Sequence, residues 1–131
     1  MKQTSYGFSK TVNLAFNDAI EKVTEELQKE GFGILTEIDV KETLKKKLDV
    51  DFKNYKILGA CNPPFAHKAL QSEEQIGLML PCNVIVYENE DGGSVVAAVD
   101  PIASMQAVEN EKLAEIAGEV KNRLKKVIEN M

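Results

Sequence analysis

Tryptophan is absent from the 131 residues, and the chain has only one histidine, His67, and two cysteines, Cys61 and Cys82. The cysteines form no Cys-x-x-Cys pair, which excludes the usual zinc-ribbon and thioredoxin motifs. No segment reaches the ~18 uninterrupted apolar residues of a transmembrane helix, so we expect no membrane partner. Residues 1–10 contain no apolar signal core. We therefore expect a cytoplasmic protein whose thiols are reduced.

Basic residues are also fewer than acidic residues. The chain has 16 Lys and Arg residues against 21 Asp and Glu residues, which gives a formal net charge of -5. An acidic surface repels a phosphate backbone, so we expect no nucleic-acid partner. The longest basic run, Lys45–Lys47, is followed at once by Leu48 and Asp49. This pattern is typical of a solvated helix face rather than of a nucleic-acid patch.

The residues that are present fit one domain covering positions 1–131. Hydrophobic residues make up 44% and charged residues 28% of the chain, which are ordinary proportions for a folded protein. The length lies in the commonest range for a single domain. We find no internal repeat, low-complexity tract or linker, so we expect no second domain.

Apolar residues three or four positions apart predict two long amphipathic helices. The first stripe runs from Val12 to Leu27, with Ser9 or Thr11 as its N-cap and Gly31 as the left-handed residue that ends it. The second helix starts near residue 108, and its apolar stripe consists of Leu113, Ile116, Ala117, Val120, Leu124, Val127 and Ile128.

Two short helices are expected between the strands. Residues 41–48 form a charged helical segment, and residues 63–70 form another that carries His67. Asn62 is a good N-cap and Pro63 suits the first helical position, so the second of these helices should begin directly after Asn62.

Runs of β-branched and aromatic residues between turn signals predict five strands. Asp91–Gly92 predicts a hairpin turn between the last two. Pro81 cannot donate to a ladder, so we expect an edge position or a bulge there. The predicted strands cover residues 3–8, 32–40, 55–61, part of 76–88, and 94–99. These elements predict an α+β fold, a mostly antiparallel sheet of about five strands with the two long helices on one face.

The sheet has a further consequence for assembly. Residues 84–87 and 95–99 are apolar at both odd and even positions. In a strand with one face in water, apolar and polar residues would alternate. Both faces of the central sheet should therefore be covered. The two long helices can cover one face, and the short helices are too small for the other. A two-fold homodimer is the commonest way to cover it.

Three stretches carry a resemblance to a known family. Residues 31–41 read Gly-Phe-Gly-Ile-Leu-Thr-Glu-Ile-Asp-Val-Lys, and residues 55–70 read Tyr-Lys-Ile-Leu-Gly-Ala-Cys-Asn-Pro-Pro-Phe-Ala-His-Lys-Ala-Leu. Residues 76–88 read Ile-Gly-Leu-Met-Leu-Pro-Cys-Asn-Val-Ile-Val-Tyr-Glu. The chain closely resembles, over almost its whole length, the family catalogued as domain of unknown function 302. The resemblance implies a compact α+β fold, small stand-alone bacterial or archaeal proteins and homodimers, but no activity.

One group of residues could hold a metal ion. Cys61 ends a strand, His67 lies about one turn into the helix that follows, and Cys82 lies on a strand that could pair beside Cys61. Thiolate and imidazole are ligands suited to zinc or copper. Three ligands would leave an open fourth position, which is the catalytic pattern. The spacing matches no standard zinc motif, however, and free cysteines are commonly buried as small hydrophobes.

Asn62 is a further candidate for ligand binding, because the free N–H groups of a helix's first turn can bind an anion. Pro63 and Pro64 remove two of those donors. Three hypotheses therefore stay open. The first is a binding domain that holds a metal ion or small ligand near Cys61, His67 and Cys82. The second is a thiol or redox enzyme, in which the helix N-terminus lowers the pKa of Cys61. The third is an interaction domain without small-molecule chemistry.

Overall fold

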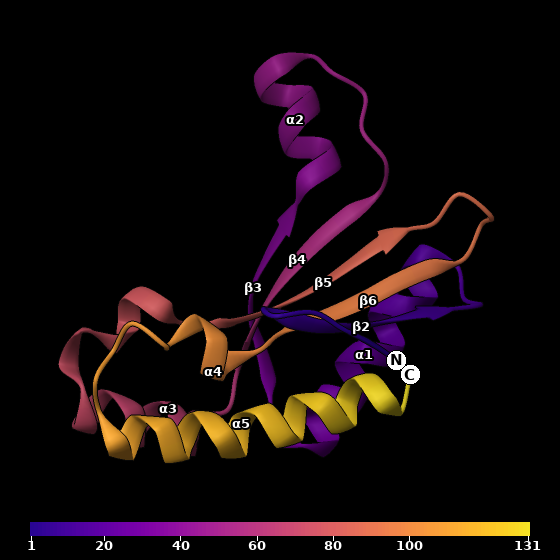
Figure 1. Cartoon of the computed structure of the whole chain (residues 1–131). Helices are drawn as coiled ribbons and strands as arrows, with labels where there is room; N and C mark the ends of the chain where they lie inside the picture. The colour runs from indigo at the N-terminus through magenta and orange to yellow at the C-terminus, as the bar shows by residue number, and fades with distance from the viewer.

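A six-stranded antiparallel sheet lies at the centre of the computed structural model, which describes residues 1–131 (Figure 1). The strand order is β1-β2-β6-β5-β4-β3, and every neighbouring pair is antiparallel. The predicted antiparallel α+β fold is confirmed, with one strand more than expected. The strands are β1 (Lys2–Gln3), β2 (Gly7–Val12), β3 (Gly33–Asp39), β4 (Tyr55–Cys61), β5 (Cys82–Glu88) and β6 (Ser94–Val99).

Two long helices, α1 (Phe16–Lys29) and α5 (Glu111–Glu129), pack on one face of the sheet, as predicted. The shorter helices are α2 (Val40–Leu48), α3 (Pro63–Ser72) and α4 (Pro101–Ser104), together with a 3-10 helix η1 (Glu74–Met79). None of the helices combines the length and the apolar character needed to cross a membrane.

The strand register decides which side chains face the two long helices. Leu58 lies opposite Val84, and Val84 lies opposite Ala98 on the next strand. All three are buried in the main core with the apolar stripes of α1 and α5. Residues of the other parity point to the opposite face, where no helix packs on them. That face, called the open face below, is formed by half-buried side chains of Tyr55, Ile57, Ile85, Tyr87 and Ala97.

The start of the chain differs from the prediction of a strand over residues 3–8. The chain reverses there, because Thr4 Oγ1 accepts hydrogen bonds from the N–H groups of Tyr6 and Gly7. The result is a hairpin of β1 and β2 instead of one strand. A short hydroxyl side chain that accepts from the backbone two or three residues on is a recognised turn signal, and the sequence interpretation overlooked it.

The first long helix also begins later than predicted. Val12 belongs to β2 and pairs with Ser94 of β6, so it is not part of the helical stripe. Neither Ser9 nor Thr11 is an N-cap, because α1 follows Ala15. Six ladder pairs with β6 hold this segment extended, and this tertiary pairing overrides the local helical periodicity.

The remaining boundaries agree with the sequence to within a few residues. Gly31 has the left-handed backbone predicted for it, with φ of 87°. The N–H of Gly31 donates to the Gln28 carbonyl and that of Phe32 donates to the Leu27 carbonyl, which completes a Schellman motif. The last helix starts at Glu111 instead of near residue 108 because Asn110 is its N-cap: the Asn110 side chain accepts from the N–H of Leu113.

Pro81 lies directly before β5, so it causes neither a bulge nor an edge position, and β5 is an interior strand. The Pro81 ring covers Gly59 of the neighbouring strand. A Cβ at Gly59 would meet Pro81 Cγ at 2.7 Å and would also clash with Thr36 Oγ1. Only glycine fits between these two side chains.

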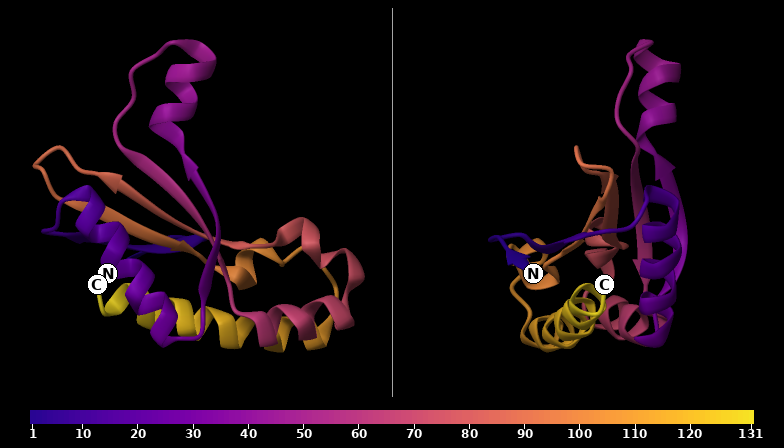
Figure 2. Two further views of the ribbon diagram at one scale, coloured as in Figure 1. Left: turned by 180° about the vertical axis from the view of Figure 1, so that it is seen from behind. Right: turned by 90° about the vertical axis from the view of Figure 1, so that its right-hand side faces the viewer.

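One segment stands away from the body of the molecule. Residues 38–53, called the arm below, include α2 and connect the outer ends of β3 and β4. The arm projects from the sheet (Figure 2). No residue of α2 is buried. Leu48, Val50 and Phe52 are exposed on the arm. Lys45–Lys47 are exposed as well, which confirms the solvated helix face predicted from their sequence.

The buried stripe of α5 can be tested by a matched pair of substitutions. Leu124 has no exposed surface, whereas Lys126 is exposed two residues further along the same helix. We expect Leu124→Ala to lower the free energy of unfolding by ~2–5 kcal/mol, because a buried Leu→Ala change leaves a cavity. Lys126→Ala should stay within about 0.5 kcal/mol of wild type. Urea denaturation followed by circular dichroism measures both; equal midpoints would contradict the described packing.

Candidate functional site

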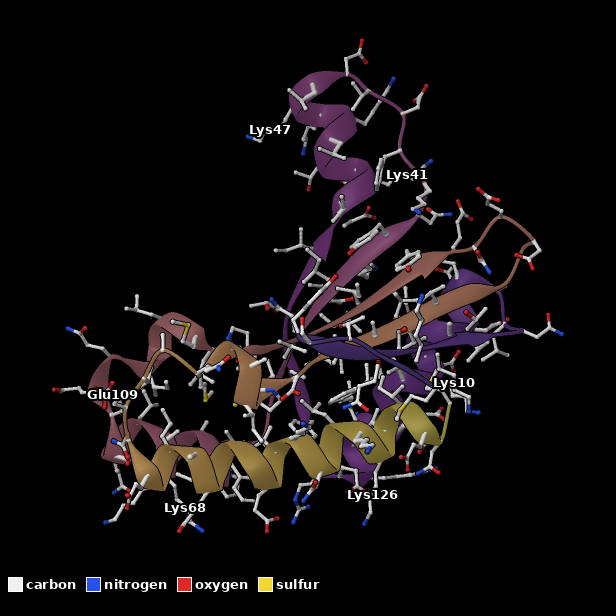
Figure 3. The ribbon with its side chains drawn as sticks, viewed as in Figure 1. Lys10, Lys41, Lys47, Lys68, Glu109 and Lys126 are labelled. Atoms are coloured by element: carbon white, nitrogen blue, oxygen red, sulfur yellow. The ribbon has the colours of Figure 1, made fainter.

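An apolar cavity of about 340 Å³ lies beyond the end of the sheet where β4 stops and β5 starts. Eighteen residues line it, of which 14 are hydrophobic, and none of the 18 carries a charged side chain. Charged side chains of the same end of the molecule, such as Lys68 and Glu109, lie on the outer surface (Figure 3). The site is therefore a hydrocarbon-lined space with charge kept outside it.

The cavity separates two hydrophobic clusters. The main core reaches it through Ala60, Cys82 and Val120. A second cluster, formed by Ala69, Ile76, Met105, Leu113 and Ala117, closes the other side through α3, α4, η1 and α5. The α3 and α5 walls were missed by the sequence interpretation. Their apolar spacing was visible, but nothing in the sequence indicated which helix faces would meet.

Two of the predicted site residues are brought together by strand pairing. Cys61 is the last residue of β4, Cys82 is the first residue of β5, and Ala60 lies directly opposite Cys82 in the ladder. Both cysteines line the cavity and are unpaired thiols. Cys82 is buried and Cys61 is half-buried.

His67 is not part of this arrangement. It lies on α3 as predicted, but it is exposed and does not line the cavity. The helical period explains its position: the α3 residues facing the cavity are 65, 66, 69 and 70, and residue 67 falls on the outer side of that stripe. No group of three or more His, Cys, Asp or Glu residues in the structure could hold a metal ion. Zinc or copper binding by Cys61, His67 and Cys82 stays a prediction that this geometry does not support.

The electrostatic environment of the thiols is the reverse of the expected one. Burial raises the pKa of Cys61 above its usual value, although a helix N-terminus was predicted to lower it. Burial, together with the neighbouring Cys61, raises the pKa of Cys82 to about 11. The prediction of a lowered pKa is wrong because α3 starts with two prolines, which offer no N–H groups to stabilise a thiolate, and the surroundings are apolar.

Asn62 lines the cavity between β4 and α3 and is only 7% exposed. It occupies the N-cap position of α3, but its side chain makes no capping bond. Its Nδ2 instead donates to the Glu30 carbonyl at 3.1 Å. Arg123 Nη1 donates to the same carbonyl at 3.3 Å, and the Arg123 guanidinium lies 5.1 Å from the Phe65 ring centre. Asn62 thus joins the end of α1 to the start of α3.

The thiol environment predicts an order of chemical reactivity. Cys61 should react with iodoacetamide before Cys82, because it is more accessible and its pKa is less strongly raised. Both should react more slowly at pH 7 than an unfolded cysteine. The rates should increase with pH as the thiolate fraction grows. Mass spectrometry of timed samples at pH 7, 8 and 9 measures this.

Single variants assign the two labelling phases. Cys61→Ser should remove the faster phase, and Cys82→Ser should leave it. Labelling of Cys61 at pH 7 faster than that of an unfolded cysteine would restore the activated-thiolate hypothesis.

Comparisons with known proteins agree with this description of the fold. The model of the family described as Domain of unknown function DUF302 matches residues 8–131. The structure is also similar to the crystal structure of an uncharacterized conserved protein DUF302 from Bacillus stearothermophilus. The two chains are 30% identical, with a TM-score of 0.88 over 96% of this chain and 98% of that chain. No curated protein matches the chain. The chain belongs to the DUF302 family, the family that its sequence resembles.

Proposed function

We propose that this protein is a homodimeric binding domain that holds a small, mostly apolar molecule in the cavity beside Cys61 and Cys82. The observation that carries the proposal is the cavity itself, whose volume of about 340 Å³ lies within the ~300–1,000 Å³ of small-molecule sites. Its walls are apolar and uncharged, so burial of hydrocarbon surface supplies the driving force for binding.

The titratable groups in the cavity favour binding over catalysis. Cys61 and Cys82 are the only titratable side chains in its lining, and both have raised pKa values. A raised pKa leaves little thiolate at pH 7, and the thiolate is the nucleophilic form. A cytoplasmic location, as the sequence predicts, would keep both thiols reduced.

A cavity-filling substitution tests the binding site. Ala66 lines the cavity from α3 and is half-buried, so Ala66→Leu should occupy part of the space without disturbing the core. We expect wild type to bind propylbenzene and Ala66→Leu to bind it at least about tenfold more weakly, a change of ~1.4 kcal/mol. Ala114→Leu, at an exposed position of α5 outside the cavity, is the matched control and should bind like wild type.

Titration followed by NMR chemical shifts gives the three dissociation constants. Failure of the wild type to bind propylbenzene or its 4-hydroxyl derivative would contradict the proposal. So would equal binding by all three proteins.

The open face supports the dimer. Its central row, Ile57, Ile85 and Ala97, is apolar and is covered by no helix of the same chain. Tyr55 and Tyr87 stack beside this row with ring centres 5.3 Å apart. An apolar sheet face of this kind is normally buried in an interface. The surface is self-complementary for a second copy, because a two-fold axis brings the same apolar row onto itself.

Light scattering at micromolar concentration should give about twice the mass of one chain. Ile85→Lys places a charge at the centre of the open face and should shift the protein to monomer, since an unpaired charge is costly to bury in an interface. Ile102→Lys replaces an exposed apolar residue on α4, which contacts α5 on the other side of the sheet, and should leave the dimer intact. A wild-type monomer throughout, or equal behaviour of the two variants, would rule out this interface.

A further inference from the structure

The apolar cavity has one polar corner, at the start of α3. Asn62 provides its acceptor. The Nδ2 atom donates to the Glu30 carbonyl, and Oδ1 accepts no hydrogen bond, either from the first turn of α3 or from elsewhere. Arg123 Nε is the only side-chain nitrogen or oxygen that is fully buried and has no hydrogen-bond partner, so Asn62 Oδ1 is not fully buried. Asn62 Oδ1 therefore keeps accessible surface, and Asn62 is one of the residues that line the cavity.

The donor of this corner is the backbone N–H of Phe65. Pro63 and Pro64 have no N–H, and the N–H of Ala66 donates to the Asn62 carbonyl at 2.9 Å. Among residues 63–66, the Phe65 N–H is thus the one donor that has no acceptor. Phe65 also lines the cavity. Residue 65 is the third helical position, whose N–H an N-cap side chain normally satisfies.

The two free groups cannot satisfy one another, because the Asn62 amide is held elsewhere. Rotating Asn62 to cap α3 would break its bond to the Glu30 carbonyl at the end of α1. The amide also lies close against Gly31, where an added Cβ would be 3.0 Å from Asn62 Nδ2. An acceptor and a donor therefore remain without partners on two residues that line the cavity.

We propose that the ligand is a compact, uncharged, mostly hydrocarbon molecule with one hydroxyl group, an alcohol or a phenol. The inference rests on the proposed function. The hydroxyl donates to Asn62 Oδ1 and accepts from the Phe65 N–H, which completes both groups at once. A hydroxyl combines donor and acceptor on one atom, whereas an ether or ketone oxygen can only accept. A carboxylate or ammonium group would lose its hydration without a partner of opposite charge in the cavity.

Three probes that share a propylbenzene skeleton test this inference: 4-propylphenol, propylbenzene and 4-propylanisole. Wild type should bind 4-propylphenol at least about fivefold more tightly than either of the others, as one satisfied buried hydrogen-bond pair implies. In ¹⁵N–¹H spectra, the Phe65 amide and the Asn62 side-chain amide should shift with the phenol and shift little with propylbenzene.

Two variants locate the preference. Asn62→Leu should bind 4-propylphenol and propylbenzene equally. Asn17→Leu, at an exposed position of α1, should keep the wild-type preference. If Asn62→Leu does not fold, the wild-type shifts of the Phe65 and Asn62 signals still decide the question.

The outcomes separate this inference from the proposed function. Equal binding of all three probes, with loss of binding in Ala66→Leu, would overturn the hydroxyl and leave the apolar site. Tight binding of 4-propylanisole would also overturn it, because a methyl ether cannot donate to Asn62. If wild type binds none of the three probes, the apolar site fails and the hydroxyl inference fails with it.

Discussion

One face of the sheet is buried under α1 and α5, and this contact decides where the other elements lie. The C-terminal half of α5 packs in the main core through Leu124, Val127 and Ile128, whereas its N-terminal half belongs to the second cluster through Leu113 and Ala117. The helix is therefore shared between two cores. The cavity lies where one core ends and the other begins, so it results from how α5 extends past the sheet.

The periodic elements could be predicted from the sequence because burial and periodicity agree in them. The α5 stripe, the β5–β6 hairpin and the Gly31 stop are all local patterns that tertiary packing reinforces. The errors lie where a distant partner overrides the local pattern. Val12 has helical spacing with Phe16, but pairing with Ser94, more than eighty residues away in the sequence, holds it in a strand.

The candidate site was predictable only in part. Cys61 and Cys82 meet because antiparallel pairing places the end of one strand beside the start of the next, and that could be inferred from strand order. The position of His67 on the outer face of α3 depends on which side of the helix contacts α5. The behaviour of Asn62 depends on a carbonyl of α1, more than thirty residues away. A good N-cap residue in the right position does not show that its side chain makes the cap.

The arm that carries α2 has a different relation to the rest of the molecule. Because α2 contributes no buried residue, its unfolding exposes little apolar surface and is only weakly coupled to unfolding of the sheet. Amide protons of α2 would then exchange with solvent through local opening, long before those of β5 and β6. Changes in the length or composition of this segment alter neither core, because none of its residues belongs to one. None of the arm's residues lines the cavity either, so the arm can be altered while the cavity keeps its walls.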